Sequence, residues 1–140
     1  MPMTDAVTQY IPQRPPIVMI DQVLAADETK ATTSFFLSEE NIFVEEGVLK
    51  EPGLIENIAQ TAAAQVGYLC KQKEIPVPIG YIAAIRHLDI STLPPVGSTL
   101  TTTIIRKNQI MDIILIEGTT RLDNRVVCSC EMRVFVKTDK

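Results

Sequence analysis

The sequence predicts an α+β domain in which an antiparallel sheet curls around one long, buried helix. Two observations support this prediction. Over residues 53–73, apolar side chains recur at the spacing of one helix face, at Ile55, Ala59, Ala62, Val66 and Leu69. On both sides of that stretch, apolar residues alternate with polar ones or form short branched runs, a pattern typical of strands. A single apolar helix between strands is buried most simply when a sheet wraps around it.

Two strands are expected before the helix, and four in a meander after it. The irregular segments are residues 1–16, which are rich in proline, and the loop 38–52. A tight hairpin turn is expected at residues 122–125, Leu-Asp-Asn-Arg. The expected strands cover residues 17–26, 29–37, 80–90, 98–107, 111–122 and 125–137.

Length and charge limit the class of protein. The 140 residues suit one domain over residues 1–140, and the net charge of −4 comes without a basic cluster. Nucleic acid is therefore not expected as a partner, because phosphate contacts need grouped Lys and Arg. No apolar run reaches the ~18 residues of a membrane span, and the first residues do not resemble a signal peptide. The expected location is the cytoplasm, with no membrane partner.

The three cysteines support the same location. Cys128 and Cys130 would point the same way from one strand, a poor geometry for a disulfide. We expect them, and Cys70, to be reduced and mostly packed, as is usual in the cytoplasm. In that last strand Val126 is expected to share the apolar face of Cys128 and Cys130.

Near the start of the predicted helix, one acid lies off the apolar stripe. Glu56 is expected in the first turn, where the helix dipole favours an ionised carboxylate. It is either a functional carboxylate or a surface acid that satisfies the dipole. Gln60 lies one turn further on and faces the same way, so it either orients Glu56, closes an apolar tunnel or is a satisfied buried amide. Gly53 either turns backbone N–H groups toward a ligand or simply breaks the chain.

Several segments together resemble a known family. Residues 11–24, IPQRPPIVMIDQVL, are similar to the opening element of the β-hydroxyacyl-acyl-carrier-protein dehydratases. Pro52-Gly53 and the segment 56–60, ENIAQ, are similar to the helix signature of that family. Residues 81–85, YIAAI, and 95–97, PVG, match a later strand and turn. The resemblance spans about residues 10–110 and implies the hotdog fold, a long central helix wrapped by an antiparallel sheet.

The resemblance also implies a chemistry. The family dehydrates 3-hydroxyacyl thioesters on acyl carrier protein, without a metal or an organic cofactor. A His removes the α-proton, and a helix carboxylate from the other subunit helps the hydroxyl leave as water. Glu56 matches that carboxylate, so it is the expected catalytic residue, at the rim of an apolar tunnel in the subunit interface and near residues 42–46 of the other chain. The expected substrate-binding residues are Gly53, Gln60, Gln13 and Phe43.

The chain lacks the His that acts as the catalytic base in the family. The family His stands in a Gly-His-Phe-Pro element, whereas residues 41–48, NIFVEEGV, contain no His. Gln13 replaces a second His in the opening element, where a structural turn role is the alternative. Glu45 and Glu46 either replace the base or are solvated loop acids. The one His of the chain, His87, is expected on the surface.

Three functions follow from these observations. The chain is a dehydratase subunit that works beside a His-bearing hotdog homologue, an acyl-thioester hydrolase that uses the carboxylate alone, or a non-catalytic module that binds acyl groups or their carrier. The expected ligand is an acyl group on acyl carrier protein or coenzyme A. A homodimer or a heterodimer is expected, because one sheet of this size cannot cover the helix on every side.

Overall fold

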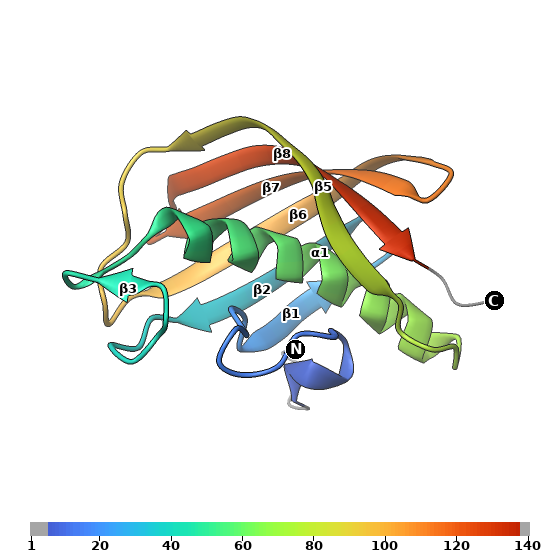
Figure 1. The fold of residues 1–140 in the computed structure, drawn as a ribbon, viewed down its shortest axis with the longest axis horizontal. Coiled ribbons are helices and arrows are strands. Elements are labelled where there is room, and N and C mark those ends of the chain that lie inside the picture. The colour runs from blue at the N-terminus through green and yellow to red at the C-terminus, as the bar shows by residue number, and fades with distance from the viewer. Residues whose placement is uncertain (1–5, 138–140) are drawn as a thin grey trace.

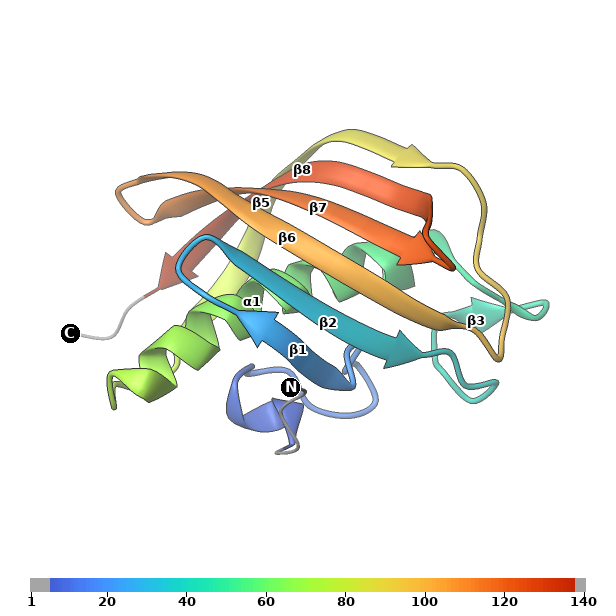
Figure 2. The same cartoon turned by 180° about the vertical axis from the view of Figure 1, so that it is seen from behind.

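A single long helix crosses the concave face of a strongly curved sheet. The structure is a computed structural model that describes residues 6–137. The helix α1, Glu51–Gln72, lies against a six-stranded antiparallel sheet, which Figure 1 shows from the helix side and Figure 2 from behind. The predicted α+β architecture of a helix wrapped by an antiparallel sheet is confirmed.

The sheet has the strand order β1-β2-β6-β7-β8-β5. A separate two-stranded hairpin, β3 and β4, lies in the loop before the helix, and a short 3-10 helix, η1, lies near the N-terminus. The bounds are η1 Val7–Gln9, β1 Gln22–Ala26, β2 Lys30–Phe36, β3 Val44–Glu45, β4 Val48–Leu49, β5 Ile79–Ile90, β6 Thr99–Ile110, β7 Ile113–Leu122 and β8 Arg125–Lys137.

The predicted four-strand meander is wrong in one respect. Strands β6, β7 and β8 do form a meander, but β5 pairs with β8 rather than with β6. The connection over residues 91–98 crosses the end of the sheet (Figure 1). It is held there because Pro94 O accepts the Leu49 N–H and Gly97 N–H donates to Leu37 O, both at 2.9 Å. Strand β6 therefore starts beside β2, and β5 is left at the edge of the sheet.

The first strand starts five residues later than predicted, at Gln22 instead of residue 17. The backbone before it is bonded to side chains of the helix. Gln60 Nε2 donates to Ile17 O at 2.9 Å, and the Met19 N–H donates to Gln60 Oε1 at 2.6 Å. These bonds satisfy the backbone of this segment without a neighbouring strand.

The most deeply buried side of the helix is not the predicted apolar stripe. Its fully buried side carries Leu54 and Ile58 together with polar residues such as Asn57 and Thr61. Of the predicted stripe only Ala62 is fully buried; Ile55, Ala59, Val66 and Leu69 are half-buried. Most of the apolar stripe is therefore only partly buried in this chain.

The polar residues on the sheet side of the helix form a buried network. Thr61 Oγ1 donates to Asn57 O at 2.8 Å and lies 2.7 Å from Thr33 Oγ1 on β2. Thr102 Oγ1 donates to Asn57 Oδ1 and lies 2.9 Å from Thr120 Oγ1, which joins β6 and β7. Because buried polar groups are costly unless paired, this network favours one position of the helix along the sheet.

The last hairpin confirms one prediction and corrects another. Asp123 and Asn124 have φ of 50° and 67°, as a two-residue type I′ turn requires. The pairing between β7 and β8 shifts immediately after this turn. As a result, Val126 is 40% exposed and Val127 is 0% exposed, although Val126 was expected to face the core.

The three cysteines are free, as predicted. Cys128 and Cys130 lie in the core and Cys70 is half-buried. Burial raises the pKa of Cys128 to about 12, helped by the nearby Cys130 and Asp89. Burial also raises the pKa of Cys130 to about 11.

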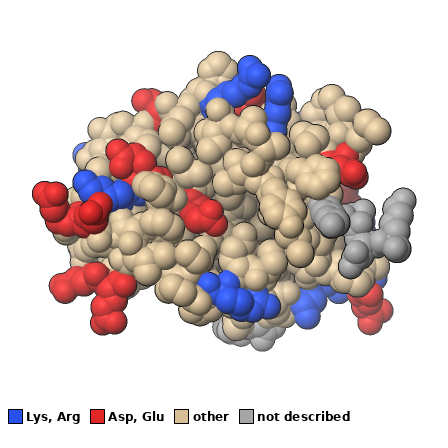
Figure 3. All heavy atoms as spheres, viewed as in Figure 1, with Lys and Arg blue, Asp and Glu red and all other residues tan. Residues whose placement is uncertain are grey.

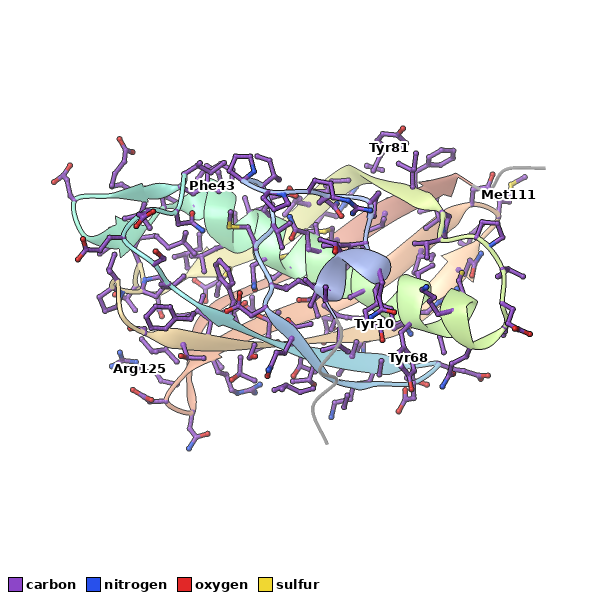
Figure 4. All side chains as sticks on the ribbon, turned by 90° about the horizontal axis from the view of Figure 1, so that it is seen from below. Tyr10, Phe43, Tyr68, Tyr81, Met111 and Arg125 are labelled. Carbon is purple, nitrogen blue, oxygen red and sulfur yellow. The ribbon has the colours of Figure 1, made fainter. Side chains whose placement is uncertain are left out.

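The N-terminal segment packs on the side of the helix away from β5. Val7, Tyr10 and Ile11 form a small apolar cluster with Ala64 of the helix. The Tyr10 and Tyr68 rings lie 5.8 Å apart (Figure 4). Gly67 allows this approach, because a Cβ there would lie 1.8 Å from Tyr10 O. Of the segment predicted to be irregular, residues 1–5 lie outside the described residues, and the rest forms only the short helix η1.

Candidate active site

An apolar cavity of about 250 Å³ lies between the helix and the far strands of the sheet. One wall is the half-buried side of α1, and the opposite wall comes from β7, β8 and β5. The apolar lining residues are Ala59, Ala62, Ala63 and Val66 from the helix, Ile114, Ile116, Val134 and Val136 from β7 and β8, and Pro78, Gly80 and Ile82 in and before β5. The predicted apolar stripe of the helix thus supplies three residues of the cavity wall, Ala59, Ala62 and Val66.

Glu56 is the one carboxylate among the residues that line this cavity, and the lining contains no His. Glu56 is half-buried and lies in the second helical turn, because the helix starts at Glu51. The acid of the first turn is Glu51, so the predicted dipole interaction belongs to that residue; it falls off within one turn. The predicted position of Glu56 beside an apolar space agrees with the structure of this chain.

Gln60 holds Glu56 in place. Its Nε2 donates to Glu56 Oε1 at 3.0 Å and to Ile17 O at 2.9 Å, and its Oε1 accepts the Met19 N–H. An amide has two N–H donors, so both are used. The orientation of the amide is fixed because its oxygen must face the Met19 N–H. Glu56 Oε1 therefore acts as an acceptor, and Oε2 has no protein partner in the described part of the chain.

Asn57 strengthens the same arrangement from the other side of Met19. Its Nδ2 donates to Met19 O at 2.7 Å, so helix side chains bind both backbone groups of Met19. Gln60 is 0% exposed and Asn57 is 1% exposed. With all its polar groups engaged inside the protein, Gln60 orients Glu56 in this structure; a direct contact between Gln60 and substrate stays a prediction.

Gln13 is brought to the cavity that Glu56 lines. Its Oε1 is buried and has no hydrogen-bond partner, which is true of no other buried side-chain polar atom within residues 6–137. Such an atom costs about 1–3 kcal/mol when it is left without a partner. Gln13 thus lines the same cavity as Glu56, and its side-chain oxygen is an acceptor without a partner.

Gly53 and Phe43 lie together at the start of the helix, away from this cavity. A Cβ at Gly53 would lie 2.5 Å from Leu49 Cδ1 and 3.0 Å from Phe43 Cβ, so close packing requires this glycine. The Gly53 N–H donates to Lys50 O at 3.0 Å, so it is already bonded within the protein. Phe43 lines a second, more open hollow of about 340 Å³ with Ile42, Glu45, Lys50, Glu51 and Pro52. Substrate contacts of Gly53 and Phe43 stay predictions.

The candidate bases of the sequence lie on the surface. Glu45, Glu46 and His87 are exposed, and none of them lines the cavity of Glu56. His87 has φ of 55° in an irregular part of β5, where the pairing with β8 shifts. In this chain, no side chain that lines the cavity could act as an imidazole base.

Strand β5 is an open edge of the sheet. It pairs with β8 on one side, and no described strand pairs with the other. Tyr81, which is 53% exposed, projects outward from it (Figure 4). In Figure 3 the centre of the face that includes β5 and the helix is mostly uncharged, and acidic and basic side chains gather toward its margins. A long edge with exposed apolar residues is a surface that pairs readily with another strand.

Two general features concern cofactors and membranes. Within residues 6–137, no three His, Cys, Asp or Glu side chains come together in a group that could hold a metal ion. No helix in the same range is long and apolar enough to cross a membrane.

The sequence reasoning missed several residues of the site. Asn57 was not singled out, although a polar residue on the buried side of a helix signals a paired network. The contribution of Pro78, Gly80 and Ile82 was also missed. It depends on the position of β5 at the edge, where it curls around the helix, and local periodicity does not report this position.

The wrapped helix, with a cavity between helix and sheet, defines a protein of the hotdog fold. Solved structures support the fold. The Xenorhabdus doucetiae dehydratase heterocomplex ApeI:P contains a chain with a TM-score of 0.91 and 18% identity, covering 98% of this chain and 94% of that one. The Campylobacter jejuni virulence protein Cj0977 has a TM-score of 0.73 and 10% identity, over 95% and 89% of the two chains. A hypothetical thioesterase from Streptococcus pneumoniae, solved with coenzyme A, has a TM-score of 0.68 and 12% identity, over 84% and 86%.

The chain belongs to the ApeP-like family, whose model, described as ApeP dehydratase, matches residues 5–140. The predicted resemblance to dehydratases of the hotdog fold is therefore confirmed. No curated protein sequence matches the chain.

Proposed function

We propose that this chain supplies the carboxylate half of a dehydratase site for 3-hydroxyacyl thioesters, and that a His-bearing hotdog partner supplies the base. The observation that carries the proposal is the cavity lining, which has one carboxylate, Glu56, and no His. Elimination of water needs a base for the α-proton and an acid for the departing hydroxyl. A carboxylate alone serves only one of these two proton transfers.

In the proposed site the acyl chain lies in the apolar cavity with its hydroxyl beside Glu56 Oε2. The partner's His takes the α-proton, the C–O bond breaks, and Glu56 gives its proton to the hydroxyl, which leaves as water. Gln60 supports this step because its bond to Oε1 leaves Oε2 without a protein partner and available to the hydroxyl. The products are a trans-2-enoyl thioester and water.

A heterodimer is the assembly that fits the proposal. The open edge of β5 offers a pairing surface, and Pro78, Gly80 and Ile82, in and just before β5, line the cavity. A partner strand on this edge would lie close to the site. The similarity to a chain of a dehydratase heterocomplex supports this choice over a homodimer. The thioester carrier is acyl carrier protein or coenzyme A, and the cytoplasm is the proposed location.

A second candidate function is thioester hydrolysis. A carboxylate in an apolar cavity can activate water without a His, and a hypothetical thioesterase is among the similar folds. The third candidate, binding without turnover, also fits a cavity that lacks a base.

One experiment separates the three. The chain is purified alone and together with a His-bearing hotdog homologue, and each sample is given a 3-hydroxyacyl carrier protein. Dehydration by the mixture but not by the single chain, lost in Glu56→Gln and kept in His87→Ala, supports the heterodimer. Release of free thiol by the single chain supports the hydrolase. Binding of the acyl group without either reaction, even with the partner present, supports the binding module.

A further inference from the structure

The cavity runs along the helix, and Glu56 lies at one end of it. Gly118 on β7 faces Ile58, because a Cβ at Gly118 would lie 2.4 Å from Ile58 Cγ2. This contact fixes the level of the helix relative to β7. From Ile58 the helix advances about 1.5 Å per residue and a strand about 3.3 Å. Four helical residues thus match about two strand residues, so Ala62 lies near the level of Ile116 and Val66 near that of Ile114. All four of these residues line the cavity.

The far end of the cavity can be placed by the same register. Ile114 pairs with Val134, and Val134 pairs with Ile82 of β5. One step further along the sheet, Val136 pairs with Gly80. Because Val136 and Gly80 also line the cavity, and Val66 is the last residue of the helix that does so, the space ends near the level of Val66. The distance along the helix from Glu56 to Val66 is about 15 Å.

We infer that the half-buried face of the helix measures the length of the acyl chain, with a limit of about a dozen carbons beyond the atom beside Glu56. An extended polypeptide advances about 3.5 Å over three backbone bonds, or about 1.2 Å per bond, and an extended acyl chain is similar. A length of about 15 Å then holds about twelve carbons. This inference rests on the proposed function, because it takes the acyl group to occupy this cavity.

Two small side chains on this face, Ala59 and Ala63, leave room for the acyl chain at two different distances from Glu56. Ala59 is three residues beyond Glu56, or about 4.5 Å, which corresponds to about four carbons. Ala63 is seven residues beyond, or about 10.5 Å, which corresponds to about nine carbons. Both are half-buried and line the cavity, so a larger side chain at either position takes up part of the cavity. A larger side chain at either position should limit the bound acyl chain to the number of carbons that fit between Glu56 and that position.

The test is a titration of S-alkyl pantetheine thioethers, with chains of four to sixteen carbons, into the chain alone and into its complex with the His-bearing homologue. Affinity should rise about fourfold per carbon and stop rising near twelve. The rise should stop near nine carbons in Ala63→Leu and near four in Ala59→Leu, with binding of the twelve-carbon ligand weakened more than tenfold in both. Lys71→Leu, an exposed change on the same helix, is the matched control and should behave as the parent chain.

The outcomes distinguish this inference from the proposed function. A shorter length limit in Ala59→Leu than in Ala63→Leu, and in both than in the parent chain, supports the inference, whether or not dehydration is observed. Affinity that is independent of length, or the same limit in every variant, overturns it while leaving the dehydration assay to decide the function. Failure of every thioether to bind overturns both. If Ala59→Leu does not fold, Ala59→Val carries the same test, since its branched side chain enters the same part of the cavity.

Discussion

Gln60 Nε2 lies 3.0 Å from Glu56 Oε1, and the same amide is fixed by backbone groups 41 and 43 residues away in the sequence. The orientation of the carboxylate is therefore set by the segment before β1, not by the helix alone. The Gln60 side chain, one helical turn after Glu56, has a fixed orientation because its oxygen accepts the Met19 N–H and its Nε2 therefore faces Glu56.

The first prediction concerns this amide. Gln60→Met should leave Ile17 O and the Met19 N–H buried without partners, at a cost of about 1–3 kcal/mol for each such group. The free energy of unfolding, measured by urea denaturation, should fall by that order. In the reconstituted complex kcat should fall more than KM rises, because Glu56 is no longer held. Gln72→Met, on the exposed end of the same helix, is the control; equal effects from both changes would contradict a specific role for Gln60.

The second prediction concerns the missing base. Ile42 is 47% exposed and precedes Phe43, as His precedes Phe in the Gly-His-Phe-Pro element of the related dehydratases. If two copies of this chain pair in the way proposed for the heterodimer, each copy can place residue 42 near Glu56 of the other copy. Ile42→His should then give the homodimer a base that faces Glu56 of the other copy. Dehydration should rise by at least tenfold, toward the range of about 10²–10⁴-fold that a well-positioned base contributes.

The controls for this gain are matched to it. Ile42→Asn adds polarity without a base and should give no increase. Ile42→His combined with Glu56→Gln should return to the background rate. An increase that survives the loss of Glu56 would show that the new His acts without the helix carboxylate.

The third prediction concerns pH. Burial raises the pKa of Cys128 and Cys130 from 9.0 to about 12 and about 11, so the folded chain keeps thiol protons that the unfolded chain loses. The stabilisation is complete below pH 9 and is lost as the pH rises through the window between these values. The free energy of unfolding should therefore fall as the pH rises from about 9 to about 12. A Cys128→Ala, Cys130→Ala double variant should show a smaller fall, and an equal fall would assign the effect to other groups.

The fourth prediction concerns Gly67. Replacing an interior helical Gly with Ala usually stabilises a helix by about 1 kcal/mol. At Gly67 the new Cβ would meet Tyr10 O at 1.8 Å, so the N-terminal segment must move. Gly67→Ala should lower the free energy of unfolding by about 1–3 kcal/mol and expose the segment around Tyr10 to proteases. A more stable variant with an unchanged digestion pattern would contradict the close contact.

The elements with a clear local period were predictable from the sequence. Strand β8 has the predicted bounds, and α1 starts two residues before the predicted position and ends one before it. The turn at Asp123 and Asn124 was predictable because its residues tolerate positive φ. Glu56 was found from the family resemblance together with its place near the start of the helix.

The remaining features depend on contacts between distant residues. The side chain of Gln60 replaces a strand neighbour for Ile17 and Met19, so a run of branched residues that predicts a strand does not form one. The polar face of the helix can be buried because Asn57 accepts a hydrogen bond from Thr102 on β6. One irregular position near the last hairpin exchanges the environments of Val126 and Val127. None of these pairings leaves a periodic signal in the sequence.

The position of β5 has a thermodynamic consequence. This strand is anchored to the sheet on one side only, yet Gly80 and Ile82 form part of the cavity wall. We therefore expect a subunit that pairs with this free edge to change the affinity of the cavity for its ligand. Linkage is reciprocal, so a ligand that tightens the association of subunits is bound more tightly by the associated form, by the same factor. Subunit dissociation measured with and without an acyl ligand would then report the affinity difference between the free and the assembled chain.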